Sequence, residues 1–217
     1  MSHSSDGSVG GHIPASDTAQ CQPDVHGDVD PHSAGHTKET TSTANRNIEI
    51  KTRVRSLGRI RSFLLERGAR HAGTDRQVDT YFNVSAGRLK IRQGTVEACI
   101  VRYDRPDTTG MRRCDYTIAH FTPDDERLDG VRSVLEAALG VLVVVAKTRD
   151  IYFIDNAKFH LDRVEGLGEF FEIEIIGRDG ESDADMKRQC EGYLDALGIT
   201  DADLIGESYS DMLLRGG

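Results

Sequence analysis

The chain has 217 residues, a formal net charge of -9 at pH 7 and four cysteines. This length suits one self-standing domain and is short for two. The acidic total argues against a nucleic-acid partner, because a polyanion favours a concentrated basic surface. No apolar run approaches the roughly 20 residues of a membrane span, and residues 1–46 lack the apolar core of a secretory signal. We therefore expect a cytoplasmic protein with reduced cysteines and no nucleic-acid or membrane partner.

Charge is distributed unevenly along the chain. Residues 47–113 carry an excess of eight positive charges, whereas residues 114–217 carry an excess of thirteen negative charges. A site where these two halves meet would bind phosphate oxygens and a metal ion together; chance segregation is the alternative.

Residues 1–46 are rich in Ser, Thr, Gly, Asp and His and contain almost no large apolar side chain. Such a segment cannot bury enough surface to offset the entropy of ordering it. We predict a disordered polar tail, with its histidines in solvent, followed by one folded domain over residues 47–217.

Strict alternation of polar and apolar residues begins at Asn47 and predicts a strand. A helix is expected over residues 56–68, then short strands over 80–83, 88–93, 97–104 and 112–119. A second helix is expected over residues 123–139, with Thr122 as its cap. Strands over 142–148, 150–154, 158–163 and 169–176 follow, then helices over 183–197 and near 210–214. Many antiparallel strands with a few helices define an α+β class.

A weak internal repeat joins two of these segments at an offset of 71 positions. The matching pairs are Asp79 and Asp150, Tyr81 and Tyr152, Phe82 and Phe153, Ala86 and Ala157, and Arg92 and Arg163. A barrel built from two similar halves would produce this repeat, and coincidence is the alternative.

Several predicted strands carry charges on one face and apolar residues on the other. Each strand alone is compatible with a sheet that has one face in water and one on the core. If the amphipathic helices cover the apolar faces from outside, the charged faces instead line a closed, water-filled lumen. The charged positions are Glu49, Lys51 and Arg53; Arg88, Lys90 and Arg92; Lys147 and Arg149; and Glu172 and Glu174.

Basic side chains crowded into a lumen repel one another, by a few kcal/mol per close pair at an effective dielectric constant of about 20. An anion of high charge density, such as triphosphate, is the occupant that we expect. Carboxylates would repel the same anion unless Mg²⁺ or Mn²⁺ intervenes, because these hard cations bind carboxylate oxygens and bridge to phosphate oxygens. The candidate carboxylates are Glu49, Glu172, Glu174 and Asp162.

The segment N-I-E-I-K at 47–51 resembles the E-x-E-x-K signature of the triphosphate tunnel metalloenzymes, also called the CYTH superfamily. Six further pieces follow in the order of that family. They are Q-V-D-T-Y-F at 77–82, G-R-L-K-I-R at 87–92, Y-D-R-P at 103–106, V-A-K-T-R at 145–149, H-L-D-R-V-E-G-L-G-E-F at 160–170 and F-E-I-E at 171–174. The resemblance covers the chain from Asn47 to about Leu214.

The resemblance implies an antiparallel β-barrel tunnel of about eight strands with flanking helices. By position it places phosphate on Lys51, Arg53, Arg88, Lys90, Arg92, Arg105, Lys147 and Arg149. It places Mg²⁺ or Mn²⁺ on Glu49, Glu172 and Glu174, with Asp162 in support, and catalysis on Glu49, Lys51, Glu172 and Glu174. Asn47 replaces the first glutamate of the signature, and since a neutral amide oxygen is a poorer ligand, one or two metal ions both stay open.

Three functions remain at this stage. The endings S-Y-S-D-M-L at 208–213 and E-G-L-G-E-F at 165–170 resemble the class IV adenylyl cyclase branch, which converts ATP to cyclic AMP and pyrophosphate. The same walls also suit a hydrolase of tripolyphosphate or thiamine triphosphate. The replacement at Asn47 keeps a third function open, a polyphosphate or nucleotide binding module without turnover. The oligomeric state stays open, with a homodimer among the alternatives.

Overall fold

The computed structural model describes residues 45–104 and 110–216. The predicted tail therefore lies outside the described residues as far as position 44. The first strand, β1, begins at Asn45, so the predicted domain boundary after Arg46 falls two residues inside a strand.

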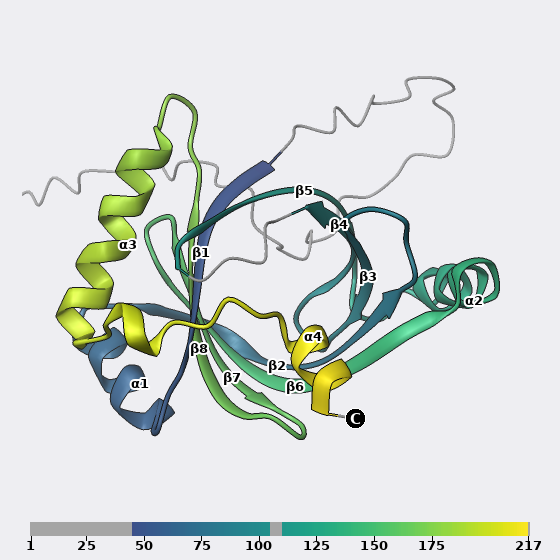
Figure 1. The fold of residues 1–217 in the computed structure, drawn as a ribbon, viewed down its shortest axis with the longest axis horizontal. Helices are drawn as coiled ribbons and strands as arrows, with labels where there is room; N and C mark the ends of the chain where they lie inside the picture. Colours follow the sequence, from purple (N-terminus) through teal and green to yellow (C-terminus); the bar gives the residue numbers. More distant parts are fainter. Residues whose placement is uncertain (1–44, 105–109, 217) are drawn as a thin grey trace, which may run out of the picture.

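Antiparallel strands form a closed barrel in the described part of the chain (Figure 1). Their order around the barrel is β1-β5-β4-β3-β2-β6-β7-β8, which confirms the predicted eight-stranded α+β fold. The strands are β1 Asn45–Arg53, β2 Arg70–Phe82, β3 Arg88–Gln93, β4 Ala98–Asp104, β5 Arg112–Phe121, β6 Val141–Ile154, β7 Ala157–Val164 and β8 Gly168–Ile176.

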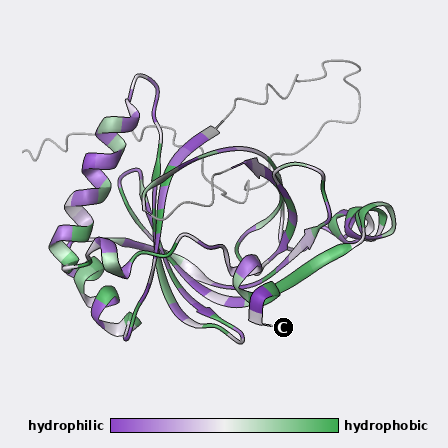
Figure 2. Ribbon diagram, viewed as in Figure 1, coloured by the Kyte–Doolittle hydropathy of each residue, from purple (hydrophilic) through white to green (hydrophobic). Residues whose placement is uncertain are grey.

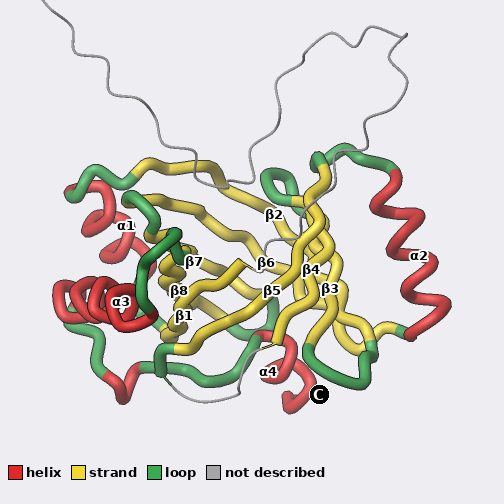
Figure 3. The backbone as a smooth tube through the Cα atoms, turned by 90° about the horizontal axis from the view of Figure 1, so that it is seen from above, coloured by secondary structure: helices red, strands yellow, loops and turns green. Residues whose placement is uncertain are grey.

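Helices cover the outside of the barrel on two opposite sides (Figure 3). On one side, α1 (Leu57–Glu66) and α3 (Asp183–Leu197) pack on the apolar residues of β1, β7 and β8, such as Phe159 and Ile173. On the other side, α2 (Arg127–Leu139) packs on Phe82, Ile91 and Ala98 of β2, β3 and β4. Because apolar side chains alternate with polar ones along these strands, the polar faces are turned into the lumen.

A short 3₁₀ turn, Asp201–Asp203, leads to the last helix, α4 (Tyr209–Gly216). This helix contacts β6 at one end of the barrel (Figure 1). No helix among residues 45–104 and 110–216 combines the length and the apolar character that crossing a membrane would require.

Two strands differ from the sequence-based prediction. β2 begins at Arg70 rather than residue 80, because its polar residues alternate between solvent and partners inside the barrel, and the alternation carries no apolar signal. β6 is one strand where two were predicted. Its apolar first half (Figure 2) is followed by the polar residues 147–150 and then by the apolar residues 151–154. The polar stretch stays in the sheet because Arg149 pairs inside the barrel with Asp162 while Asp150 pairs outside with Arg61.

The second helix also differs from the prediction. It begins at Arg127 rather than Pro123, and Thr122 does not cap it. The carbonyl oxygen of Thr122 instead accepts a hydrogen bond from the amide of Asp125, which forms a turn before the helix.

The internal repeat does not correspond to equivalent positions in the two hairpins. Asp79 pairs with cations inside the barrel, whereas Asp150 pairs on the outside with Arg61 of α1. Tyr81 and Tyr152 likewise belong to different apolar clusters. Asp150 is paired with Thr74 of β2 and shares its face, whereas Asp79 lies five residues further along β2 and faces the other way. The matched residues therefore do not mark two similar halves.

Ser182 caps α3, and removal of its hydroxyl should lower the free energy of unfolding. Its hydroxyl accepts a hydrogen bond from the amide of Asp185 at 3.2 Å, and the Asp185 carboxylate bonds back to the Ser182 amide at 3.3 Å. We expect Ser182→Ala to lower the free energy of unfolding by about 1 kcal/mol. The matched control is Ser133→Ala within α2, whose hydroxyl bonds only a helix carbonyl at 2.9 Å. Denaturant unfolding checks both variants, and an equal loss in the two would contradict the capping role.

Candidate functional site

Three cations meet on one carboxylate inside the barrel. Asp79 of β2 accepts hydrogen bonds from Lys90 Nζ at 2.8 Å, from Lys147 Nζ at 2.8 Å, and from Arg92 Nε and Nη2 at 2.8 and 3.1 Å. We call these four residues the Asp79 cluster. The structure thus brings together three of the predicted phosphate ligands, from β3 and β6.

Burial shapes the ionisation of this cluster. Burial alone would raise the pKa of Asp79, but Arg92, Lys147 and Lys90 together hold it well below its usual range. Burial lowers the pKa of Lys147 to about 7, although Asp79 opposes the shift. The cluster therefore keeps an ionised carboxylate, and the charge of Lys147 changes near neutral pH.

Glu97 forms further ion pairs beside the Asp79 cluster, with Arg92 and Lys158. Glu97 accepts hydrogen bonds from Arg92 Nη1 at 2.9 Å and from Lys158 Nζ at 2.5 Å. Burial opposes ionisation of Glu97, yet Lys158 and Arg92 hold its pKa well below the usual range. Lys158 was not among the predicted site residues, and its pairing with Glu97 adds a further cation to this network.

Glu172 of β8 lies at the centre of a second group, which we call the Glu172 cluster. Its carboxylate is 2.7 Å from Arg149 Nη2, 3.2 Å from Lys51 Nζ and 3.3 Å from His160 Nδ1. Burial would raise the pKa of Glu172, but Lys51 and Arg149 hold it well below its usual range. Burial and the neighbouring Arg149 lower the pKa of His160. In the strand order, β8 and β1 are opposite β3 and β2, so Glu172 and Lys51 face the Asp79 cluster across the lumen. Strand β6 joins the two clusters, because it contributes Lys147 to one and Arg149 to the other.

Asp162, predicted to support a metal ion, is fully buried and occupied by protein partners. Arg149 donates two hydrogen bonds to it, from Nε at 2.7 Å and from Nη2 at 2.5 Å. The hydroxyl of Tyr209 in α4 donates a third at 2.8 Å. The Tyr209 ring also lies under Lys51, whose Nζ is 3.8 Å from the ring centroid. In this structure Asp162 positions Arg149 and Tyr209.

Glu49 and Glu174 are directly opposite each other on β1 and β8, and both are half-buried. The Asn47 amide donates a hydrogen bond to Glu174, while the Asn47 side-chain oxygen is buried without a hydrogen-bond partner. No three His, Cys, Asp or Glu side chains converge on a metal site within the described residues. Two facing carboxylates and one unpaired amide oxygen nevertheless fit Mg²⁺ or Mn²⁺, which take oxygen ligands and leave several positions to water or substrate phosphate.

Two further predicted cations, Arg88 and Arg53, lie outside the two clusters. Arg88 pairs with Asp211 of α4 at 2.8 Å. Arg53 is exposed; it donates to the Leu167 carbonyl at 2.8 Å and lies over the Phe170 ring. Arg105 lies outside the described residues.

Sequence reasoning did not assign roles to Asp79, Glu97 or Tyr209. Asp79 belongs to the Q-V-D-T-Y-F segment. If β2 had been predicted to include Gln77, the two residues would have been placed on the same face of the strand, and Asp79 would have been recognised as a lumen residue. Glu97 and Tyr209 gave no periodic signal, because Glu97 lies in the turn just before β4 and Tyr209 begins a short helix.

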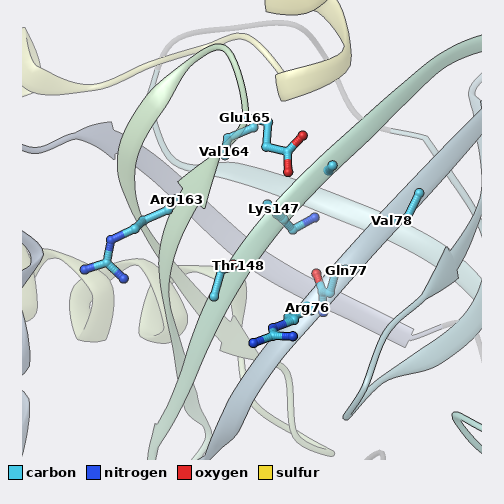
Figure 4. Close-up of a pocket in the computed structure, with 9 residues that line it drawn as sticks. Arg76, Gln77, Val78, Lys147, Thr148, Arg163, Val164 and Glu165 are labelled. Atoms are coloured by element: carbon cyan, nitrogen blue, oxygen red, sulfur yellow. The ribbon is translucent and has the colours of Figure 1, made fainter.

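A cavity of about 350 Å³ lies on β2, β6 and β7, lined in part by Arg76, Thr148 and Arg163 (Figure 4). Arg76 and Arg163 are exposed, and they alternate along their strands with the buried residues that face the lumen. This cavity therefore belongs to the outer surface and contains neither ion cluster in full.

A family model, the CYTH domain, matches residues 45–209. The chain belongs to the CYTH domain family. CYTH domains are triphosphate tunnel metalloenzymes, which process triphosphate substrates and whose chemistry implies a divalent metal. The predicted resemblance is thus confirmed.

Solved structures share the CYTH fold of this chain. The PH1012 protein of Pyrococcus horikoshii OT3 is 26% identical with a TM-score of 0.64, over 76% of this chain and 98% of that one. A proposed adenylate cyclase of Vibrio parahaemolyticus is 19% identical with a TM-score of 0.61, over 79% and 99%. A proposed adenylyl cyclase of Hippeastrum, described as revealing a dominant triphosphatase activity, is 20% identical with a TM-score of 0.53, over 78% and 96%. A search of curated proteins gave no match.

The pKa of Lys147 predicts a pH dependence of anion binding. The ammonium group loses its proton as the pH rises through about 7, so its contact with a phosphate oxygen weakens above that pH. Lys147→Arg keeps its charge over this range. We expect the ratio of the tripolyphosphate dissociation constants, wild type over Lys147→Arg, to rise about tenfold between pH 6 and 8.5. Calorimetric titrations at both pH values measure it; the ionisation of the ligand cancels in the ratio, and a constant ratio would contradict the assignment.

Proposed function

We propose that this CYTH domain is a class IV adenylyl cyclase-like enzyme that converts ATP to cyclic AMP and pyrophosphate. The observation that supports it is the arrangement of the Asp79 cluster on one wall of the lumen and the carboxylates Glu49, Glu172 and Glu174 on the facing wall. Such a lumen presents cations to phosphate oxygens and oxygen ligands to a divalent ion at the same time.

The cations of the Asp79 cluster can bind phosphate without leaving their carboxylate. An ammonium group carries three donors, and each of Lys90 and Lys147 gives one of them to Asp79. The remaining donors stabilise the negative charge that builds on the departing pyrophosphate. Because these donors are held in place before the reaction, little reorganisation is required in the transition state.

The carboxylate wall holds the reacting end of the substrate. Glu49 and Glu174 would bind Mg²⁺ or Mn²⁺, which supplies positive charge to the phosphate oxygens when bound. Lys51 and Arg149 are held beside Glu172 and neutralise charge on the attacked phosphoryl group. In the reaction, the ribose 3′-hydroxyl loses its proton to solvent, its oxygen forms a bond to the α-phosphorus, the bond from that phosphorus to the bridging oxygen breaks, and pyrophosphate leaves.

Aromatic side chains beside the cations favour an organic triphosphate over an inorganic one. Lys90 Nζ lies 5.4 Å from the ring centroid of Tyr81 and 6.0 Å from that of Tyr103. Both rings belong to an apolar cluster that Tyr116 contacts. Such rings offer a stacking surface to a nucleobase.

The second candidate is a triphosphatase, in which water attacks a terminal phosphoryl group. The solvent exposure of the carboxylate wall favours it, since the Glu172 side chain is 19% exposed although three groups pair with it. With ATP as the substrate, cyclic AMP and pyrophosphate identify the cyclase, whereas orthophosphate identifies the triphosphatase.

One assay separates these functions. Purified protein is incubated with ATP, thiamine triphosphate or tripolyphosphate in the presence of Mg²⁺ or Mn²⁺, and the products are resolved by chromatography. We expect cyclic AMP and pyrophosphate from ATP. Orthophosphate together with ADP, thiamine diphosphate or pyrophosphate, and no cyclic AMP, would replace the cyclase by the triphosphatase. Binding without turnover would indicate a binding module.

Glu172→Ala should abolish metal-dependent turnover, because it removes the carboxylate that holds Lys51 and Arg149 in place. We expect a loss of at least about 100-fold in kcat, the size of effect seen when a preorganised electrostatic group is deleted. Glu169→Ala is the matched control: Glu169 is on the same strand, faces the other way, and pairs with the exposed Arg163 at 3.2 Å. Equal kcat values for the two variants would remove Glu172 from the mechanism.

A further inference from the structure

Asp79 binds three cations in the lumen, yet the proposed chemistry gives it no contact with substrate. Its side chain is 1% exposed. Three cations from β3 and β6, the two strands that flank β2, bond to it at 2.8 to 3.1 Å. Asp79 therefore either competes with phosphate for the three cations or holds the three cations in place for phosphate.

The geometry favours organisation. Asp79 is too deeply buried to move away when a ligand enters, and the lysines give it one donor each, so they keep donors for a second anion. Arg92 divides its guanidinium between Asp79 and Glu97. Both carboxylates fix its plane, and the cluster keeps an excess of positive charge.

We infer that Asp79 is a positioning residue that holds Lys90, Arg92 and Lys147 together, so that their remaining donors converge on the oxygens of a triphosphate. The inference rests on the proposed function. It adds a residue that acts through the phosphate ligands rather than on the substrate.

Loss of the carboxylate would affect all three cations. Like charges within hydrogen-bonding distance of one point repel each other strongly in a buried environment. Without Asp79 the two lysines and Arg92 move apart, and Lys147, whose pKa burial already lowers to about 7, loses its proton more readily. Both changes weaken the binding of a polyanion, and they outweigh the removal of one repelling negative charge.

The test compares two isosteric substitutions at buried, ion-paired aspartates. Asp79→Asn removes the charge inside the lumen. Asp150→Asn is the control, because Asp150 is only 7% exposed and pairs with Arg61 and Thr74 outside the barrel. Titration calorimetry measures the binding of tripolyphosphate without divalent metal. We expect Asp79→Asn to raise the dissociation constant at least tenfold and Asp150→Asn to change it less than twofold.

Two further variants separate positioning from general destabilisation. Asp79→Glu restores the charge at a shifted position and should bind between threefold and tenfold more weakly than the wild type. In a Lys147→Gln background, Asp79→Asn should raise the dissociation constant by a smaller factor than in the wild type, because part of its effect passes through Lys147. A purely structural effect would be the same in both backgrounds and would overturn the inference.

Each remaining outcome is decisive. Wild-type affinity in a folded Asp79→Asn protein, or tighter binding, overturns the inference and leaves the proposed function standing. Wild-type protein that binds no triphosphate overturns both. If Asp79→Asn does not fold, the comparison moves to Asp79→Glu and Asp150→Glu: a loss of threefold or more at position 79 alone supports the inference, and equal affinities overturn it.

Discussion

Closure of the sheet forces the charged faces of its strands to share one enclosed volume, and the pairing of those charges is the interaction on which the structure depends. Two like charges about 4 Å apart repel by about 4 kcal/mol at an effective dielectric constant of about 20. Asp79, Glu97 and Glu172 each bind two or more cations, and the pKa of each is held well below its usual range. Their contribution to stability is therefore complete above the ordinary pKa of a carboxyl group and declines as the pH falls through the depressed values.

The same ion pairs fix the positions of the basic side chains in the lumen before a ligand binds. The basic side chains that pair with buried carboxylates are held in place and keep further N–H donors for a ligand. The half-buried Glu49 and Glu174 are paired across β1 and β8 and can coordinate a metal ion. The CYTH family of this chain processes triphosphates, and the two walls supply what that chemistry requires from protein: fixed positive charge and oxygen ligands. The choice between cyclisation and hydrolysis depends on which oxygen reaches phosphorus, the ribose 3′-oxygen or that of a water molecule.

Much of the fold could be predicted from the sequence. Alternation from Asn47 to Arg53 gave the first strand and the side of it that faces the lumen, and the amphipathic helices implied cover from outside. Prediction failed where polar residues occupy both faces of a strand: the first ten residues of β2, and the Arg149–Asp150 pair of β6, lack an apolar period because their partners are distant in sequence. For the same reason, Lys90, Arg92 and Lys147 were among the predicted site residues but their common partner Asp79 was not. Asp162 was predicted to support a metal ion, and its contacts with Arg149 and Tyr209 were not predicted.

The central claim is that triphosphate binds in the lumen between the Asp79 cluster and the glutamate wall. A crystal structure with tripolyphosphate and Mn²⁺, located by anomalous scattering, tests it most directly. The account predicts phosphate oxygens within hydrogen-bonding distance of the Lys90 and Lys147 ammonium groups and Mn²⁺ beside Glu49 and Glu174. Phosphate bound instead on the outer surface at Arg76 and Arg163, with the lumen unchanged, would contradict it.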